Sequence, residues 1–387
     1  PDSYVFDIAL NYNRVFAAGQ FDNVAGIQHS GAVSFNLNSG DLLTWNPQLS
    51  RSGQYYLADL NAVYADSNNV YLGGHFDQVA GTTRYNAAAV ATANNAALQS
   101  WDPSPSYIVR DIAADGNNLL VGGDFEFCKG ASRSYIAQID SATGLVTTWN
   151  PGANSYVYAI TQNGNNVYIG GTFTTLGGIA RNNLGAVNAN TGVVASFNPN
   201  MNSNVYALAF DASDILYVGG IFTTAGGSTR NRLAAFATNG NLQSWDPNSN
   251  SQINAIAVSG STIYVGGSFT TLNGATARNR LAAVNNTNGT VTAFNPNMNS
   301  TIQDLKVEGT TLYAGGSFTS ANGTGRNYLA SFNTSNGNLN SWNPSANSTV
   351  NAIAARNDTV FVGGSFSVVG GSSRIRLAAV RGGAGTN

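Results

Sequence analysis

The residues best able to do chemistry gather in three consecutive copies of one short phrase. Five copies read GGTFTT, GGIFTT, GGSFTT, GGSFTS and GGSFSV, whereas the first three read AGQFDN, GGHFDQ and GGDFEF. The exceptional copies place a carboxylate directly after the phenylalanine and a polar residue directly before it: Asp22, Asp77 and Glu126, preceded by Gln20, His75 and Asp124. Carboxylates, amides and a histidine in adjacent loops favour recognition of a polar ligand such as a carbohydrate.

A longer loop between the first two copies adds aromatic rings. Residues 47–60 span 13 positions, whereas the equivalent residues 247–253 span 6, and the insertion carries Arg51, Tyr55 and Tyr56. Tyrosine rings stack on the apolar faces of sugars while carboxylates and amides take the hydroxyl groups. We therefore expect a ligand-binding face over the first three repeats. The alternative is that these repeats have drifted in sequence without a functional cause.

The candidate ligand-binding residues are Gln20, Asp22, His29, Tyr55, Tyr56, His75, Asp77, Asp124, Glu126 and Lys129. They allow two classes of function. The leading interpretation is a non-catalytic binding or structural module that recognises a glycan or a protein partner. The alternative is a carbohydrate-active enzyme, either a polysaccharide lyase or a glycosidase, on the same face. Hydrolysis would require two carboxylates roughly 5 to 10 Å apart, and no pair has an assured catalytic role. A deep cleft would favour catalysis, and a shallow rim would favour binding.

The sequence lacks the signature motifs of several common chemistries. The chain has no G-x-S-x-G, Walker or H-E-x-x-H motif and only two histidines, His29 and His75, which nearly excludes a histidine-based metal site. The single cysteine, Cys128, rules out an internal disulfide. A net charge of −2 without a basic block argues against nucleic acid as a partner. No cofactor is expected, although the Asn- and Asp-rich turns could hold calcium.

These side chains are positioned by a repeat that covers the whole chain. The phrase of β-formers, glycines and an aromatic recurs eight times, with its phenylalanine at 21, 76, 125, 173, 222, 269, 318 and 366. A second phrase, aromatic-Asn/Asp-Pro, ends at Pro47, 103, 151, 199, 247, 296 and 344. Pro1 fits as the last residue of an eighth copy. Each unit of about 48 residues contains four apolar runs of strand length, joined by Asn- and Gly-rich turns.

Four antiparallel strands per unit of this length are typical of a β-propeller blade. The sequence therefore predicts a single all-β domain, an eight-bladed β-propeller of four-stranded antiparallel blades. The expected blades are residues 1–46, 47–102, 103–150, 151–198, 199–246, 247–295, 296–343 and 344–387. Blade 8 ends after its third strand, so we expect it to lack its outer strand, with residues 382–387 forming a linker.

The repeated residues have structural interpretations. Glycine in a strand marks close approach of another backbone, so the glycine pair should let neighbouring blades converge near the hub. The phenylalanine of the phrase and the aromatic of the fourth strand should fill the wider space between blades. Asp7, Asp111 and Asp304 replace an alanine of the first strand and should bond backbone or water near the channel.

A basic residue follows the phenylalanine of each phrase by eight or nine positions. These residues are His29, Arg84, Arg133, Arg181, Arg230, Arg278, Arg326 and Arg374. Arginine presents a planar fork of N–H donors, which suits carbonyl and carboxylate acceptors. We expect the arginines to form a structural ring that bonds loop carbonyls or the Asn or Asp of the aromatic-Asn-Pro phrase. The alternative is a ring of positive charge that faces a ligand.

The blade resembles those of kelch-type and delta-sixty-type bacterial propellers, which carry a paired-glycine second strand and an aromatic in the fourth. The matching residues in one blade are Gly170, Gly171 and Trp149, and the resemblance extends over the whole chain. It implies the propeller fold. It leaves function open, because these families bind proteins, sugars or nothing known.

Composition suggests where the protein works. Charged residues make up 9% of the chain, and Lys129 and Lys306 are its only lysines. Such a neutral surface rich in Asn, Ser and Thr suggests an exported bacterial protein, extracellular or on the cell surface, and the chain is expected to be part of a larger multidomain protein. No apolar stretch reaches the 18 residues of a membrane span.

Overall fold

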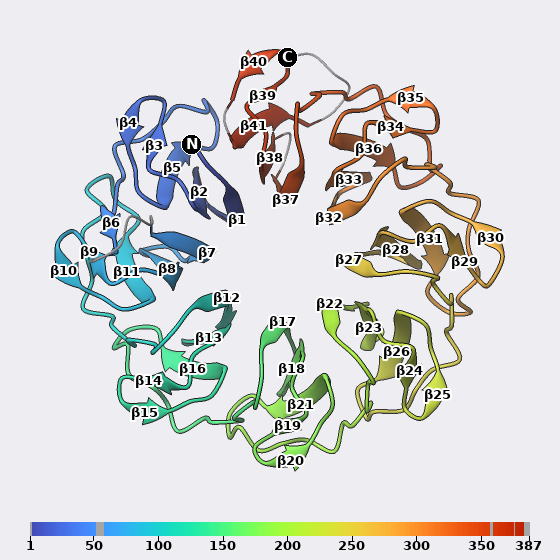
Figure 1. The fold of residues 1–387 in the computed structure, drawn as a ribbon, viewed down its shortest axis with the longest axis horizontal. Coiled ribbons are helices and arrows are strands. Elements are labelled where there is room, and N and C mark those ends of the chain that lie inside the picture. Colours follow the sequence, from blue (N-terminus) through green and yellow to red (C-terminus); the bar gives the residue numbers. More distant parts are fainter. Residues whose placement is uncertain (1, 52–57, 357–358, 375, 383–387) are drawn as a thin grey trace.

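The computed structural model describes residues 2–51, 58–356, 359–374 and 376–382. Within them the regular structure consists of strands, arranged as eight blades around a central axis (Figure 1). Each blade contains a sheet of three antiparallel strands in chain order, with the first strand nearest the axis. Blade 1 closes the ring, because β1 (Val5–Asn11) packs against β37 (Val350–Arg356) and β38 (Thr359–Gly364) of blade 8. The predicted all-β, eight-bladed propeller is confirmed.

The bounds of the strands repeat from blade to blade. The other inner strands are β7 (Asp59–Ala65), β12 (Val109–Asp115), β17 (Val157–Asn163), β22 (Val205–Phe210), β27 (Ile253–Ser259) and β32 (Ile302–Glu308). The other middle strands are β2 (Arg14–Gly19), β8 (Asn69–His75), β13 (Asn118–Gly123), β18 (Asn166–Gly171), β23 (Ile215–Gly220), β28 (Thr262–Gly267) and β33 (Thr311–Gly316). The third strands are β5 (Ala32–Asn36), β11 (Ala87–Ala91), β16 (Ile136–Asp140), β21 (Leu184–Asn188), β26 (Leu233–Ala237), β31 (Leu281–Asn285), β36 (Leu329–Asn333) and β41 (Leu377–Arg381).

Between the middle and third strands each blade carries a short hairpin. The hairpins are β3 (Asn23–Val24) with β4 (Ile27–Gln28), β9 (Gln78–Val79) with β10 (Thr82–Thr83), β14 (Phe127–Cys128) with β15 (Ala131–Ser132), β19 (Thr175–Leu176) with β20 (Ile179–Ala180), β24 (Thr224–Ala225) with β25 (Ser228–Thr229), β29 (Thr271–Leu272) with β30 (Thr276–Ala277), β34 (Ser320–Ala321) with β35 (Thr324–Gly325), and β39 (Val368–Val369) with β40 (Ser372–Ser373). In blade 2, β6 (Leu49–Ser50) adds a third strand to the hairpin.

The predicted fourth strand is reduced to a single antiparallel bridge in seven blades. Its members are Phe35 with Leu42, Val90 with Leu98, Ile139 with Val146, Val187 with Val194, Phe236 with Leu242, Val284 with Val291, and Phe332 with Leu339. Three residues after each bridge stands the Trp or Phe of the aromatic-Asn-Pro phrase, and the proline then turns the chain away. In blade 8, the described residues contain no such partner for β41.

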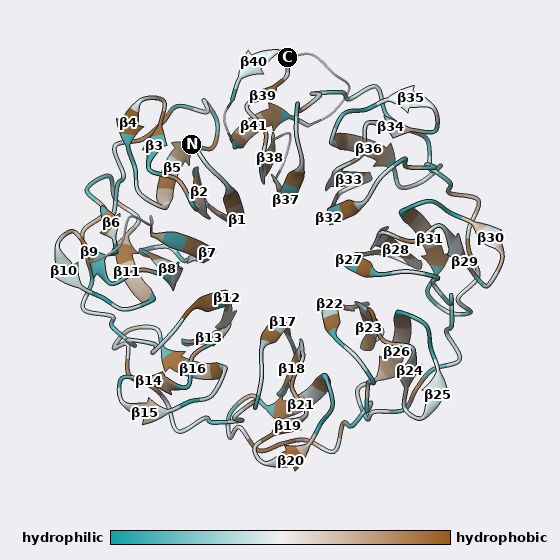
Figure 2. Ribbon diagram, in the orientation of Figure 1, coloured by the Kyte–Doolittle hydropathy of each residue, from teal (hydrophilic) through white to brown (hydrophobic). Residues whose placement is uncertain are grey.

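The core lies between neighbouring blades, where apolar faces of adjacent sheets meet (Figure 2). The outer aromatics pack there as predicted, and the five tryptophans are almost fully buried. Each indole N–H donates to a carbonyl at the end of the third strand of the next blade, at distances of 2.5 to 3.0 Å. Because a buried indole needs an acceptor, this bond fixes both the ring and the spacing of two blades.

The two glycines of the pair are required for different reasons. A β-carbon on Gly170 would lie 2.7 Å from Cγ1 of Val205 in the next blade, which confirms the predicted close approach of blades. A β-carbon on Gly171 would lie 2.0 Å from the carbonyl oxygen of Tyr156, which belongs to the same blade. The second glycine therefore leaves room for the backbone of the inner strand in its own sheet. In blade 1 the first position is Ala18, which belongs to the same buried cluster as Leu60, whereas the second remains glycine.

The expected place of Pro1 in the repeat is wrong by two residues. Pro1 itself lies outside the described residues. The Asp2 carboxylate accepts from the backbone N–H of Asp22 at 2.8 Å, and the Asn154 amide oxygen accepts in the same way from Thr174 at 2.7 Å. Asn154 stands three residues after Pro151, so Pro1 aligns two residues beyond the proline of the phrase.

Candidate functional site

Each inner strand begins with a β-bulge at the same end of the wheel. The middle strand of each blade ends beside this bulge, so residues from two strands of every blade lie together at this end of the wheel. We call this end of the wheel the rim. A bulge inserts one unpaired residue and re-aims its side chain. The bulged residues are Phe6, Asn61, Arg110, Tyr158, Tyr206, Asn254, Gln303 and Asn351.

On blades 6 to 8 several amide and hydroxyl side chains of the rim bond to one another or to the next blade, while Arg280, Tyr328 and Arg376 occupy the position that Tyr135 holds in blade 3. The Asn254 amide donates to the carbonyl of Ile302 in the next blade at 2.9 Å. The hydroxyls of Ser268 and Thr301 lie 3.2 Å apart, and those of Ser317 and Thr349 are also 3.2 Å apart. These bonds connect adjacent blades, so the residues that form them have a structural role.

On blades 3 to 5 the rim carries a row of tyrosines. The ring centroids of Tyr135 and Tyr156 are 6.0 Å apart, those of Tyr156 and Tyr158 are 6.4 Å apart, and those of Tyr158 and Tyr206 are 5.6 Å apart. Tyr156 remains 43% exposed. The Tyr206 hydroxyl accepts from the amide of Asn204 at 3.0 Å. The row presents ring faces and polar edges together, which is an arrangement that suits sugars.

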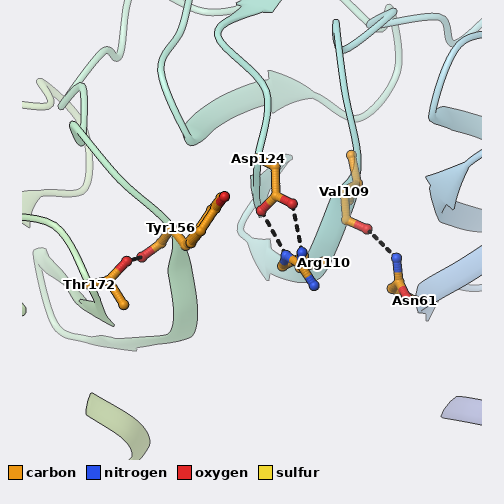
Figure 3. A network of polar contacts seen from close by, with 6 residues as sticks. All are labelled: Asn61, Val109, Arg110, Asp124, Tyr156 and Thr172. Atoms are coloured by element: carbon orange, nitrogen blue, oxygen red, sulfur yellow. Dashed lines mark hydrogen bonds and ion pairs between the residues drawn. The ribbon is translucent and has the colours of Figure 1, made fainter. Parts of the chain in front are cut away.

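An arginine fork lies beside this row. Arg110 donates from Nε and Nη2 to the two carboxylate oxygens of Asp124, at 2.7 and 2.6 Å (Figure 3). The guanidinium carbon lies 5.7 Å from the ring centre of Tyr156. The Arg110 side chain is 41% exposed and that of Asp124 is 7% exposed. The hydrogen bonds to Asp124 raise the pKa of Arg110. A bidentate pair fixes the guanidinium plane, so one edge remains presented to the rim.

Blades 1 to 3 extend the same surface. The rings of His75 and Tyr107 lie 5.3 Å apart, and Tyr107 is 49% exposed. Burial raises the pKa of Asp59, although a hydrogen bond from Gln20 and the nearby His75 oppose this effect. Burial lowers the pKa of His75, as does the charge of Arg51, while Asp59 and Asp77 act in the opposite direction. One buried oxygen of Asp59 has no hydrogen-bond partner among the described residues.

We call the combined surface the rim arc. It comprises Gln20, Asp59, His75, Tyr107, Arg110, Asp124, Tyr135, Tyr156, Tyr158 and Tyr206. It holds three residues that the sequence singled out: Gln20, His75 and Asp124. The tyrosines were missed. The sequence could have indicated them, because Tyr156 and Tyr158 occupy repeat positions at which a later blade has Gln252 and Asn254.

Of the other predicted ligand-binding residues, two lie near the rim arc: the charge of Asp77 acts on His75, and burial together with the charge of Glu126 raises the pKa of Tyr135. Asp22, Asp77 and Glu126 directly precede the hairpin strands β3, β9 and β14 in the chain. His29 is 2% exposed, and burial lowers its pKa, so its ring does not face solvent. Lys129 occupies the hairpin turn of blade 3 with a φ of 46°. Tyr55 and Tyr56 lie outside the described residues.

Neighbouring Cys128 is buried, which raises its thiol pKa to about 12 and makes it a poor nucleophile or metal ligand. Within residues 2–51, 58–356, 359–374 and 376–382, no three His, Cys, Asp or Glu side chains group closely enough to hold a metal ion. The described part of the chain also has no helix that is long and apolar enough to cross a membrane.

Comparisons with known proteins agree with the propeller fold. The family model described as "Domain of unknown function (DUF5122) beta-propeller" matches residues 215–242 and 311–341. The computationally designed protein Ika8 is similar in structure, with a TM-score of 0.65 and 17% identity over 95% of this chain and 96% of that chain. Sqt1 of Saccharomyces cerevisiae gives a TM-score of 0.53 and 13% identity over 94% of each chain. No curated protein matches the chain.

The chain is a β-propeller repeat protein. Identities of 13% and 17% show the fold of this propeller alone, since one fold hosts many functions.

The arginines that follow the phenylalanine of each repeated phrase donate to backbone carbonyls. Six of them, Arg84, Arg133, Arg181, Arg230, Arg278 and Arg326, donate one Nη to the carbonyl of the preceding residue and the other to a carbonyl of the outer segment. Arg84 and Arg230 also approach Asp102 and Asp246, at 3.9 and 3.6 Å. Arg374 donates to the carbonyl of Ser373, and the described residues offer it no outer-segment acceptor.

Replacing Arg230 by alanine should lower the free energy of unfolding by about 1 to 3 kcal/mol, because it leaves the Gln243 carbonyl without its donor. Arg374→Ala is the matched control and should cost less than half as much, because its outer-segment acceptor is missing. Urea denaturation of both variants measures the difference. Equal losses would show that the outer-segment bond does not contribute to stability.

Of Asp7, Asp111 and Asp304, the three aspartates that replace an alanine of the inner strand, two connect adjacent blades. Asp7 accepts from the backbone N–H of Val63 at 2.8 Å, and Asp304 accepts from that of Ile353 at 2.7 Å, each in the next blade. Burial raises the pKa of Asp304 to about 6 and that of Asp111 to about 6, and the charge of Asp7 adds to the shift at Asp111. These carboxyls are therefore expected to titrate in mildly acidic solution.

Proposed function

We propose that the propeller is a glycan-binding module of an exported bacterial protein and that the rim arc is its binding surface. The observation that carries the proposal is the exposed tyrosine row beside the Arg110–Asp124 pair. Sugar rings would stack on Tyr156 and Tyr107, while the Arg110 fork and neighbouring amides would bond their hydroxyl or carboxylate groups. A surface this long suits an extended oligosaccharide.

One observation favours the catalytic alternative on the same surface. Asp59 combines a raised pKa with a buried oxygen that lacks a described partner, and His75 lies close enough to alter that pKa. Perturbed carboxyls of this kind occur at the general acids of carbohydrate-active enzymes. A polysaccharide lyase or glycosidase would therefore use Asp59 and His75, and it would release product from the glycan that the rim arc binds.

The test is a panel of neutral and acidic polysaccharides, applied with and without calcium and scored for both binding and product. We expect binding without product. Tyr156→Ala should weaken it at least tenfold, about 1.4 kcal/mol, by removing a stacking face. Tyr12→Ala is the matched control, because Tyr12 is 70% exposed in the turn after β1, at the opposite end of the wheel.

The outcomes separate the alternatives. Product formation that Asp59→Asn abolishes would establish the enzyme. Binding that Tyr156→Ala and Tyr12→Ala leave equally intact would place the site elsewhere. No binding across the panel would turn attention to a protein partner.

A further inference from the structure

The charges of the chain are unevenly divided between the two halves of the wheel. Residues 1–198, which supply blades 1 to 4, contain 7 Lys and Arg against 13 Asp and Glu, a net charge of −6. Residues 199–387 contain 10 Lys and Arg against 6 Asp and Glu, a net charge of +4. The overall charge of −2 therefore hides a basic half, and such a half attracts anionic ligands.

One position of the repeat brings basic side chains to the rim. It directly precedes the third strand, and its backbone N–H donates to the carbonyl of the phenylalanine in the repeated phrase. In blade 3 the position is Tyr135, whose ring contacts that of Tyr156 in the next blade. In blade 8 it is Arg376, whose guanidinium carbon lies 5.2 Å from the ring centre of Tyr4 in blade 1. The eight occupants are Gly31, Asn86, Tyr135, Asn183, Arg232, Arg280, Tyr328 and Arg376.

Asparagine suits the structural demands of this position. The backbone is left-handed, with a φ of 59° at Asn86 and 61° at Asn183, and asparagine tolerates this conformation better than most residues. The Asn86 amide donates to the carbonyl of Pro105 at 2.9 Å, and the Asn183 amide donates to that of Met201 at 2.8 Å. Both acceptors lie in the loop that leads to the next inner strand, so asparagine also connects two blades.

Arg232 and Arg280 lack both advantages. Each has a φ of 63°, which is unfavourable for a long side chain. The carbonyls that correspond to Pro105 and Met201 belong to Ser249 and Met298, and in the described part of the chain no side chain donates to them.

The two guanidinium groups are weakly bonded. Nη1 of Arg232 donates to the amide oxygen of Asn231 at 3.4 Å, and Nη1 of Arg280 donates to that of Asn279 at the same distance. Arg376 differs, because its guanidinium donates to the carbonyl of Ser365 and packs on a ring. Arg232 and Arg280 therefore keep most of their N–H donors available at the rim of adjacent blades.

Their charges are also not neutralised. Among the described residues no carboxylate lies within 4 Å of Arg232 or Arg280. The carboxylates of blade 5 without an ion pair, Asp211 and Asp214, lie in the turn after the inner strand, at the opposite end of the wheel, and blade 6 has no Asp or Glu. Backbone strain combined with an unpaired charge is typical of a functional surface rather than of a structural contact.

We propose that Arg232 and Arg280, which we call the basic pair, bind the carboxylate or sulfate groups of an anionic polysaccharide. The inference rests on the proposed function, because the rim arc ends at Tyr206 in blade 5 and the basic pair continues it through blades 5 and 6. Planar N–H forks match carboxylate and sulfate oxygens, while the adjacent tyrosine row favours a glycan over an acidic peptide. Because blades 1 to 3 carry carboxylates, the charged sugars should lie over blades 4 to 6.

The test uses two pairs of ligands that share a backbone and differ in charge. They are oligogalacturonate with its methyl ester and dextran sulfate with dextran, titrated calorimetrically into the full chain. At least one anionic form should bind about tenfold more tightly than its neutral partner. The double variant Arg232→Asn with Arg280→Asn should remove this difference and leave the affinity for the neutral form unchanged. Arg356→Gln is the matched control, because it removes an exposed positive charge at the opposite end of the wheel, and it should change the affinity less than about twofold.

Thermal unfolding separates a ligand site from a structural role. The double variant should melt at the same temperature or higher, because asparagine already fits this position in blades 2 and 4. A lower melting temperature would assign the arginines to the structure and overturn the proposal.

Three binding results would also overturn it. They are equal affinities for the anionic and neutral forms, an undiminished preference for the anionic form in the double variant, and tighter binding of polyglutamate than of either anionic glycan. Tyr156→Ala distinguishes this failure from failure of the proposed function. A glycan whose affinity falls in Tyr156→Ala but not in the double variant would leave the rim arc as the binding surface and remove only the basic pair from it.

Discussion

Gly220→Ala is expected to lower the free energy of unfolding by about 3 kcal/mol or more, because the new methyl group has no space. A β-carbon at Gly220 would lie 2.1 Å from the carbonyl oxygen of Asn204. That oxygen belongs to the chain entering the inner strand of the same blade and accepts from the N–H of Ile221. Relief would require the inner strand to move away from the middle strand. Chemical denaturation followed by tryptophan fluorescence measures the loss.

The matched control is Gly325→Ala in a hairpin of another blade. A β-carbon there would meet no atom within 4 Å, and Gly325 is exposed. Its substitution should change the stability by less than about 0.5 kcal/mol. Similar losses for both variants would show that general glycine effects, rather than the contact with Asn204, limit the second glycine of the pair.

Asp111→Ala should stabilise the protein at pH 7 by about 2 to 3 kcal/mol and have little effect at pH 4. Burial and the charge of Asp7 raise the pKa of Asp111 from 3.8 to about 6. The folded protein therefore binds this proton more tightly than the unfolded chain. The contribution of the protonated Asp111 carboxyl to the free energy of unfolding is fully present below pH 3.8 and is lost as the pH rises through about 6. Alanine occupies the same position in blade 4, as Ala159, so the substitution fits the repeat.

Urea denaturation from pH 4 to pH 7 measures this dependence. Asp111→Asn should show the same flattened pH profile, because it also removes the ionisable group. Asp304→Ala should gain less at pH 7, since it gives up the bonds from Ile353 and Leu305. An unchanged pH slope in Asp111→Ala would mean that the carboxyl is hydrated and titrates normally.

The fold was predictable because every blade obeys the same physical constraints. The spacing of the phrases predicted eight blades, and the glycine pair predicted the close approach of neighbouring blades, which the structure shows at Gly170 and Val205. The size of the fourth strand was not predictable, because a single bridge and a full strand have the same apolar pattern. The register of Pro1 was misjudged because proline alone does not define the turn. The contacts of Asp2 define it instead.

The rim was only partly predictable from the sequence. Deviations from the repeat drew attention to Gln20, His75 and Asp124, which do lie at the rim. His29 was a candidate from the regular series of basic residues, yet its ring is buried, because periodicity does not report burial. The bulge of the inner strand aims Arg110 and Tyr158 toward the rim, and a bulge leaves little trace in an apolar pattern. The tyrosine row therefore emerged from the structure.

The most direct test of the account is to map a bound oligosaccharide on the propeller by hydrogen–deuterium exchange. The ligand is the tightest binder of the polysaccharide panel, and the more weakly binding Tyr156→Ala serves as the reference. The account predicts slower exchange in residues 104–110 and 154–158, which carry Tyr107, Arg110, Tyr156 and Tyr158. Protection confined to the opposite end of the wheel, around Tyr12, or to the outer hairpins would contradict a binding site on the rim arc.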